Sequence, residues 1–254
     1  MKPTFSLFGI TFTSYSLFMF SGAAVCLVMF VVLTFKRRKG HYEENIFALE
    51  MLIIAMAAAI PAAMLFDSLF HMAERGKFAI QGATFYGGLL FAIAIWPLLL
   101  LIKRNRKVTI YERLCDVAPG IPLGHCLGRL GCFCGGCCYG RPTSSPFGVV
   151  FPEGSVPYQH YGAAALHPTQ LYEAYALLVI FLILLLFCKK HALPVYFMLY
   201  ALARFTIECF RADDRGAIFG LPLSPAQIIS VCLFIVGEVM VIVYLKKKLN
   251  QLKG

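Results

Sequence analysis

The chain has 254 residues, of which 59% are hydrophobic and 14% charged, and its formal net charge is +10. Soluble domains have about 45–50% apolar and about 25% charged residues, so the composition excludes disordered, collagen-like, coiled-coil and ordinary soluble classes. It indicates an all-α integral membrane protein. The excess of Lys and Arg is expected of residues that flank membrane spans, so we predict no nucleic-acid partner.

Apolar runs near the length of about 20 residues that crosses a bilayer predict seven transmembrane helices, the fourth being the least apolar. In chain order they are Ser14–Phe35, Ile46–Phe66, Phe85–Ile102, Asp116–Leu127, Leu171–Cys188, Leu193–Phe210 and Ala226–Leu245. They predict one membrane-embedded domain over residues 1–254. Its longest segment outside the spans, roughly residues 128–170, is expected on the outer side.

Four clusters of basic residues test this arrangement, because they follow the first, third, fifth and seventh spans. They are Lys36–Lys39, Lys103–Arg113, Lys189–Lys190 and Lys246–Lys253. Seven spans place all four clusters on one side of the membrane. The positive-inside rule then predicts that the N-terminus lies outside and the C-terminus in the cytoplasm.

Two ionisable residues lie within the sixth predicted span. Burying one costs about 2.5–3.5 kcal/mol on insertion scales, so such residues are functional candidates. Arg204 and Glu208 are four residues apart and share one helix face, and Arg211 follows one turn later. We expect this group to handle a substrate, the alternative being an ion pair that holds helices together.

Two predicted spans begin alike on the outer side, with His167–Gln170 before the fifth and Ser224–Gln227 before the seventh. Proline suits the first helical position, and Ser224 with Gln227 matches a capping box. Helix N-termini attract phosphate, although most such ends are ordinary caps. Glu173 lies one turn inside the fifth span, where a carboxylate needs a partner, and an arginine is the expected one.

A glycine-rich stretch, Gly128–Gly140, follows the fourth predicted span. Gly124 and Gly128 are four apart, which predicts a bare helix face that another helix can approach. The later glycines allow positive φ and exposed N–H groups, and Arg129 beside them would complete an anion site. Tyr86 and the glycines after it open the third span on the same outer side.

Four of the ten cysteines are clustered within seven residues of this stretch: Cys132, Cys134, Cys137 and Cys138. One structural disulfide is possible on the outer side of a bacterial membrane. The spacing is cramped for a tetrahedral metal site, so we predict no metal. The third alternative is that these cysteines are small packing residues.

Four segments, in this order and spacing, resemble the prolipoprotein diacylglyceryl transferase family. They are Tyr86–Leu89, Gly128–Phe133, His167–Glu173 and Arg204–Glu208, and Ser224–Gln227 fits as well. The string His-Pro-Thr-Gln-Leu-Tyr-Glu is the most specific of them. The resemblance covers roughly residues 85–230, and the seven-span topology agrees with it.

The resemblance implies an enzyme that moves the diacylglyceryl group of phosphatidylglycerol onto the lipobox cysteine thiol of a prolipoprotein, releasing glycerol-1-phosphate. It implies a multi-pass protein of the bacterial cytoplasmic membrane. The implied partners are phosphatidylglycerol, the lipoprotein signal peptide and the lipid bilayer, and no cofactor is implied.

By this resemblance, Arg129 and Arg204 bind the lipid head group and Glu208 orients Arg204. The residues predicted to be catalytic are Arg129, Arg204, Glu208, His167 and Tyr86. Those predicted to bind the substrate are Gly87, Gly88, Gly128, Gly131, Gln170, Tyr172, Glu173, Arg211 and Gln227.

The chain departs from the family pattern at three positions. Tyr86 replaces a His that is a proposed base, Cys132 replaces Asn, and Cys137 replaces Glu. The base is therefore open between Tyr86, His167 and the lipid phosphate. The acceptor is open as well, because a glycan or another hydroxyl could replace the lipoprotein thiol.

Two other classes of function compete with the transferase. A membrane thiol-redox or metal-binding protein would use the cluster from Cys132 to Cys138. A non-catalytic lipid-binding homologue is allowed by the three departures. Against the second stands the retention of Arg129, Arg204 and Glu208, since an inactive protein gains little from charges at membrane depth.

Overall fold

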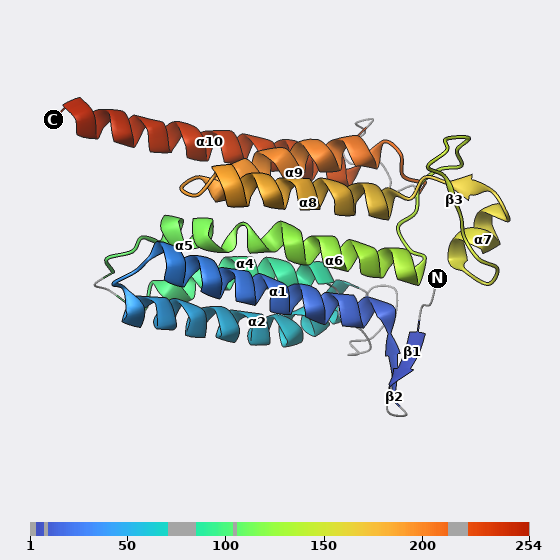
Figure 1. The fold of residues 1–254 in the computed structure, drawn as a ribbon, viewed down its shortest axis with the longest axis horizontal. Helices are drawn as coiled ribbons and strands as arrows, with labels where there is room; N and C mark the ends of the chain where they lie inside the picture. The colour runs from blue at the N-terminus through green and yellow to red at the C-terminus, as the bar shows by residue number, and fades with distance from the viewer. Residues whose placement is uncertain (1–3, 8–9, 71–84, 104–105, 213–222, 254) are drawn as a thin grey trace. The chain divides into compact units, whose positions relative to one another are not determined.

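The computed structural model describes residues 4–7, 10–70, 85–103, 106–212 and 223–253, which are mainly helical (Figure 1). The helices are α1 Ser14–Arg37, α2 Tyr42–Phe70, α4 Phe85–Leu100, α5 Ile110–Val117, α6 Gly120–Gly135, α7 Val156–Tyr161, α8 Thr169–Phe187, α9 Ala192–Glu208 and α10 Pro225–Lys253. Two short antiparallel strand pairs join β1 Thr4–Leu7 with β2 Ile10–Thr13, and β3 Val149–Val150 with β4 Ala165–Leu166.

Among the described residues, four helices are long and apolar enough to cross a membrane. They are Ser14–Arg37, Tyr42–Phe66, Thr169–Phe187 and Pro225–Lys246. These correspond to the first, second, fifth and seventh predicted spans and confirm a helical membrane protein. The helices at the other three predicted spans, α4, α6 and α9, have 16, 16 and 17 residues, so the count of seven stays a prediction.

The boundaries predicted for the fourth span are wrong. Residues 116–127 do not form one helix: α5 ends at Val117, and α6 runs from Gly120 to Gly135 with Pro119 at its N-cap. The helix continues into the glycine-rich stretch and ends only at Gly136, which adopts the left-handed conformation with φ of 70°. Arg129 therefore lies on a helix, and the long segment that connects α6 to α8 begins after Gly135.

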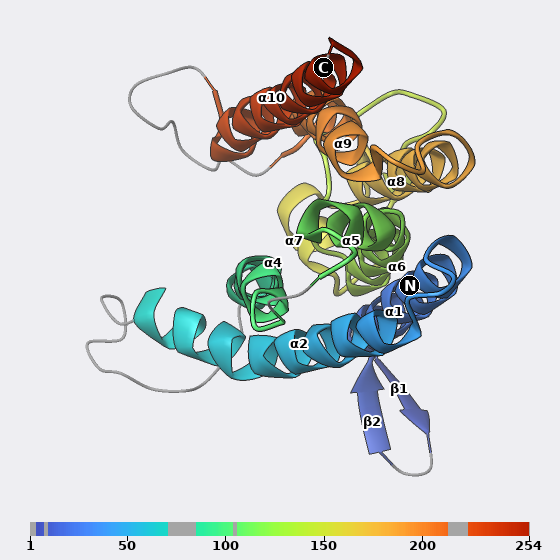
Figure 2. The same ribbon diagram turned by 90° about the vertical axis from the view of Figure 1, so that its left-hand side faces the viewer.

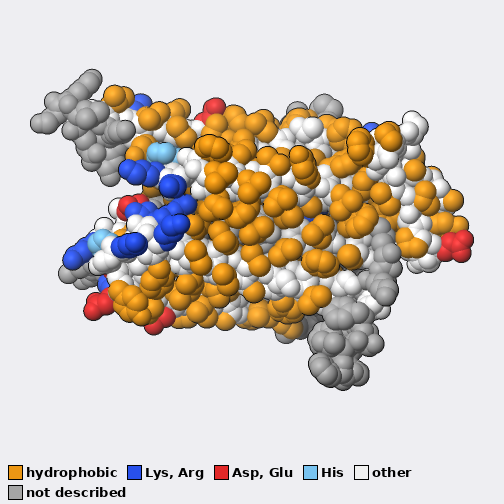
Figure 3. Space-filling view, viewed as in Figure 1, with side chains coloured by type: hydrophobic (Ala, Val, Ile, Leu, Met, Phe, Trp, Pro, Cys, Tyr) orange, Lys and Arg blue, Asp and Glu red, His pale blue; other side chains and the backbone are white. Residues whose placement is uncertain are grey.

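Hydrophobic side chains cover the visible sides of the helices (Figure 3). Large apolar residues on α1 and α8 are among the most exposed of the chain, with Phe20 and Tyr175 each 71% exposed. Outward-facing apolar surface of this kind is costly in water and is typical of helices that contact lipid.

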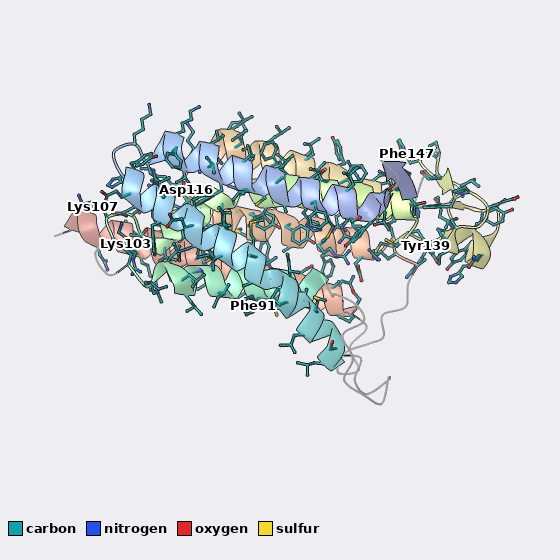
Figure 4. The ribbon with its side chains drawn as sticks, turned by 90° about the horizontal axis from the view of Figure 1, so that it is seen from below. Phe91, Lys103, Lys107, Asp116, Tyr139 and Phe147 are labelled. Atoms are coloured by element: carbon teal, nitrogen blue, oxygen red, sulfur yellow. The ribbon has the colours of Figure 1, made fainter. Side chains whose placement is uncertain are left out.

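The chain divides into two compact units, Val31–Leu114 and Met1–Phe30 with Cys115–Gly254. The prediction of a single domain therefore remains a prediction. In the smaller unit, α2 and α4 pack together, and the Trp96 indole donates a hydrogen bond of 3.2 Å to the Ala48 carbonyl. Lys103 and Lys107 follow α4 (Figure 4), and the Lys107 N–H donates to Glu44 at 3.0 Å.

In the larger unit, α6 packs on α8, α8 on α9, and α9 on α10. Figure 2 shows these helices nearly end-on. The core between α6 and α8 is apolar, with Cys126, Ala174 and Leu177 buried together. This row of packed helices places polar side chains of α6, α8 and α9 within reach of one another.

The first half of α1 approaches α6 through small residues. A Cβ atom added at Gly124 would lie 2.6 Å from the Gly22 carbonyl oxygen, and one at Gly120 would lie 3.0 Å from that of Cys26. Gly131 is similarly close to Phe18. The predicted bare face is confirmed at Gly124, whereas a Cβ at Gly128 would meet nothing within 4 Å.

We expect Gly124→Ala to destabilise this unit, because its methyl group would overlap the Gly22 carbonyl; overpacking typically costs about 1–3 kcal/mol. Gly128→Ala is the matched control on the same helix. It should raise stability by up to about 1 kcal/mol, since alanine favours a helix over glycine. Thermal unfolding of both variants in detergent measures the difference, and equal destabilisation of the two would contradict the close approach.

The segment between α6 and α8 carries β3, α7 and β4. Tyr139, labelled in Figure 4, packs its ring against Phe151, His160 and Tyr161 at centroid distances of 6.0 to 6.4 Å. The backbone of Gly140 pairs with His167 and Arg211. The segment is therefore joined to the start of α8 and to the chain that follows α9.

Candidate active site

Five buried charged residues of the larger unit form a continuous chain of alternating sign. In order along the chain of contacts they are Arg129, Glu173, Arg204, Glu208 and Arg211. They come from α6, α8, α9 and the residues just after α9. Three guanidinium groups face two carboxylates, so the group carries one surplus positive charge. A buried cluster with this balance is suited to bind an anion.

Glu173 lies at the centre of the cluster and is only 1% exposed. Its Oε1 atom lies 3.0 Å from Nη2 of Arg129 and accepts a hydrogen bond of 3.1 Å from the Tyr200 hydroxyl. Its Oε2 atom lies 3.8 Å from Nη1 of Arg204. One carboxylate therefore positions two arginines from different helices, and the prediction that Glu173 has an arginine partner is confirmed.

Glu208 holds the other side of Arg204. Its Oε2 atom lies 2.7 Å from Nη2 of Arg204 and 3.8 Å from Nε of Arg211, while its Oε1 accepts a hydrogen bond of 3.0 Å from the Ser224 hydroxyl. The shared helix face predicted for Arg204 and Glu208 is confirmed. Glu208 thus links α9 to the start of α10.

The cluster retains hydrogen-bonding capacity that the described residues do not use. Within them, Nη1 of Arg204 is buried and has no hydrogen-bond partner, and the same holds for Oε1 of Gln170. An unused buried donor is costly, and native structures leave few of them. A guanidinium with a free N–H group beside a surplus positive charge can donate to an oxyanion.

The N-terminus of α10 agrees with the sequence prediction, and that of α8 agrees in part. The Ser224 N–H donates to Gln227 Oε1 at 3.0 Å and the Gln227 N–H donates to Ser224 Oγ at 3.3 Å, which confirms the capping box. The fifth predicted span begins at Thr169 with Pro168 at the N-cap, so His167 lies one residue before the cap.

His167 and Tyr172 form a pair beside the cluster. Nδ1 of His167 lies 3.0 Å from the Tyr172 hydroxyl, and the His167 ring packs edge-on against Phe210 at 5.2 Å. Gln170 is buried and donates a hydrogen bond of 2.6 Å to the Cys137 carbonyl. The His167 side chain therefore contacts two aromatic residues and hydrogen-bonds to one of them, whereas the Gln170 side chain holds the loop that follows α6.

The glycine-rich stretch that was predicted to bind an anion through its loop is helical in the structure as far as Gly135. Gly128 and Gly131 lie inside α6, where their N–H groups belong to the helix, so the expectation of exposed N–H groups is wrong there. Gly88 lies in α4, in the smaller unit, with the Ala59 carbonyl 2.8 Å from the place of a Cβ. Tyr86 and Gly87 lie in the first turn of α4, and the Tyr86 side chain lies outside the described part of the structure.

Three of the clustered cysteines meet at the end of α6. The Sγ atoms of Cys132, Cys137 and Cys138 all lie within 4.8 Å of one another, and every cysteine of the chain is a free thiol. Hydrogen bonds from the two neighbouring thiols and the guanidinium of Arg211 hold the pKa of Cys138 below its ordinary value. Cys134 does not join this group.

Two residues of the site escaped the sequence analysis. His125 accepts a hydrogen bond of 3.3 Å from Nε of Arg129, and its Nε2 lies 3.7 Å from Glu173. Tyr200 hydrogen-bonds to Glu173. Helical spacing could have identified both residues. His125 lies four residues before Arg129 and Tyr200 four residues before Arg204, so each shares a helix face with an arginine predicted to be catalytic.

Comparisons with known proteins agree with the resemblance seen in the sequence. Residues 2–243 match the family model described as prolipoprotein diacylglyceryl transferase. The chain is 30% identical to a phosphatidylglycerol–prolipoprotein diacylglyceryl transferase of Clostridium tetani, over 93% of this chain and 95% of that protein. It is 29% identical to a second protein of that description in Clostridium perfringens, over 98% and 94%. A relative in Chlorobaculum tepidum is 36% identical over 66% of this chain.

Proposed function

Since the chain belongs to the prolipoprotein diacylglyceryl transferase family, we propose that it transfers the diacylglyceryl group of phosphatidylglycerol to the lipobox cysteine thiol of a prolipoprotein. Relatives whose names state this activity support the transferase over a redox, metal-binding or lipid-binding protein. The observation that carries the proposal is the pair Arg129 and Arg204, buried on either side of Glu173.

Arg129 and Arg204 bind the phosphate of phosphatidylglycerol in this proposal. A phosphate matches the forked donors of guanidinium, and a buried site strengthens each of these contacts. The surplus positive charge of the cluster is neutralised by the single charge of the lipid phosphodiester. Nη1 of Arg204, which lacks a hydrogen-bond partner among the described residues, supplies a donor for it.

The transfer forms a bond between the acceptor sulfur and a glyceryl carbon while the bond from that carbon to a phosphate oxygen breaks. Negative charge grows on the departing phosphate, so donors placed beforehand stabilise the transition state more than the ground state. Arg129 and Arg204 serve this role, and Glu173 and Glu208 keep them in position. Glycerol-1-phosphate leaves.

The remaining predicted residues surround this centre. Arg211 completes the chain of charges, Gln170 fixes the loop after α6, and Gln227 caps α10. His167 and Tyr172 form a hydrogen-bonded pair at the start of α8. His167, Tyr86 and a phosphate oxygen remain the candidates for accepting the thiol proton. Gly87, Gly88, Gly128 and Gly131 are proposed to shape the lipid-binding surface.

We propose that the protein crosses the bacterial cytoplasmic membrane seven times, with its N-terminus outside. The near-continuity of α5 and α6 supports a fourth crossing, because only two residues separate them. The basic clusters that follow alternate spans support the orientation. The arginine cluster would then lie below the outer head-group layer, where phosphatidylglycerol and the signal peptide are both within reach.

Incubation of the purified protein with labelled phosphatidylglycerol and a lipobox peptide tests this function. We expect a thioether-linked diacylglyceryl peptide and an equal amount of glycerol-1-phosphate. A peptide with serine in place of the cysteine is the control for the acceptor and should receive no label. Transfer to the serine peptide, or to a glycan but not to the thiol, would contradict the proposed acceptor.

A further inference from the structure

We propose that Cys132, Cys137 and Cys138 bind a thiophilic divalent cation of the zinc class, whose fourth coordination position accepts the thiol of the acceptor peptide. The metal site stands on the arrangement of the three sulfurs. Its role in the reaction rests on the proposed function. Nothing in the comparisons assigns a metal to this chain.

The fold brings the three sulfurs together despite their tight spacing in sequence. Cys132 lies in the last turn of α6, and Gly136 ends that helix in the left-handed conformation with φ of 70°. Cys138 also has a positive φ, of 62°. These two residues turn the chain back over the helix end, so that all three Sγ atoms lie within 4.8 Å of one another.

This separation is close to what a metal requires. Zinc–sulfur bonds of about 2.3 Å in a tetrahedron place sulfurs about 3.8 Å apart, which small side-chain rotations can reach here. Left-handed backbone at a non-glycine residue costs about 1–3 kcal/mol and persists where its surroundings require it. At Cys138 the strained backbone points the thiol towards its two neighbours.

The surroundings fit the charge of such a site. Three thiolates and a dication carry one net negative charge, and the backbone bridge between Gly140 and Arg211 brings a buried arginine to the segment that carries the ligands. The Cys137 and Cys138 carbonyls accept hydrogen bonds from Gln170 and Thr169, at 2.6 and 2.7 Å. The backbone that would carry the ligands is thus held from α8, which limits the cost of ordering it on binding.

No fourth His, Cys, Asp or Glu ligand joins the group within the described part of the chain. Three protein ligands with one open position are the pattern of catalytic rather than structural zinc sites. Cys137 is exposed, so an incoming ligand can approach from its side. Arg129 lies three residues before Cys132 on α6, so one proposed metal ligand and one proposed phosphate ligand are neighbours on the same helix face.

A thiol that coordinates a dication is deprotonated, and its proton passes to water. The metal-bound sulfur then supplies the electron pair for the new carbon–sulfur bond. The carbon–oxygen bond to the phosphate breaks, and the phosphate leaves with that electron pair towards Arg129 and Arg204. The metal ion thereby supplies the activation that the three candidate bases leave open.

The first arm of the test measures metal alone. Purified protein is reduced, stripped with a chelator, loaded with Zn²⁺ or Co²⁺, dialysed, and analysed for metal per chain. We expect one equivalent in the wild type and in Cys134→Ser, the matched control from the same segment. Cys132→Ser, Cys137→Ser and Cys138→Ser should each weaken binding by more than about tenfold, the least that even an outer partner costs.

The second arm compares transfer to a lipobox peptide by stripped and Zn²⁺-loaded enzyme across pH. The loaded enzyme should be active at neutral pH, whereas the stripped enzyme should need a pH near the ordinary thiol pKa of about 8.5. No metal in the wild type, equal binding by all variants, or identical pH profiles would overturn the proposal. Stoichiometric metal without transfer at any pH would instead contradict the proposed function and leave the metal site standing.

Discussion

Replacing Arg204 with alanine is expected to lower the rate of diacylglyceryl transfer by about 10³-fold or more. Loss of a single preorganised donor to a developing oxyanion costs about 10²–10³ in rate, and Arg204 supplies both a charge and several donors. The variant also leaves Glu208 without its contact of 2.7 Å. Initial rates with phosphatidylglycerol and a lipobox peptide measure the effect, and we expect Arg129→Ala to behave alike.

Arg204→Lys separates geometry from charge, because lysine keeps the charge but loses the fork. We expect it to recover only a small part of the rate. Lys190→Ala, in the basic cluster after α8, is the control and should transfer at the wild-type rate. If Arg204→Ala is folded and fully active, the arginine does not bind the head group.

Replacing Glu173 with alanine is expected to reduce the free energy of unfolding by about 3–5 kcal/mol, the usual cost of removing one partner of a buried ion pair. Arg129 and Arg204 would be left facing each other without the carboxylate that separates them. Thermal unfolding in detergent checks the loss. Transfer should fall as well, because both arginines lose their position.

Tyr175→Ala is the matched control for Glu173→Ala, since it lies two residues further along α8 and is 71% exposed. It should change stability little. Glu173→Gln retains the size of the side chain and an acceptor for Tyr200, so its stability should lie between those of the alanine variant and the wild type. Wild-type stability of Glu173→Ala would show that the carboxylate does not hold the cluster together.

The sequence predicted the chemistry of this site better than its geometry. Arg204 and Glu208 stood out because charges are expensive within an apolar span, and helical spacing gave their shared face. The need of Glu173 for an arginine followed from the same cost. That Arg129 and Arg204 meet on one carboxylate depends on the packing of α6, α8 and α9, which no local pattern encodes.

Helix boundaries were harder to predict where glycine is frequent. Because glycine permits positive φ, the sequence predicts exposed N–H groups in the stretch after Leu127. The helix instead continues to Gly135, and its glycine at position 124 admits a close approach of Gly22, a contact between residues distant in sequence. The meeting of three cysteine sulfurs likewise depends on the left-handed residues Gly136 and Cys138, whose conformations the spacing did not reveal.

An experimental structure of the protein with phosphatidylglycerol bound tests the central claim most directly. We expect phosphate oxygens within about 2.7–2.9 Å of guanidinium nitrogens of both Arg129 and Arg204, the usual length of charge-assisted hydrogen bonds. The glyceryl carbon should face the loop after α6 that carries Cys137 and Cys138. A phosphate held by the basic residues that follow α4, with both buried arginines still paired only to Glu173 and Glu208, would contradict the account.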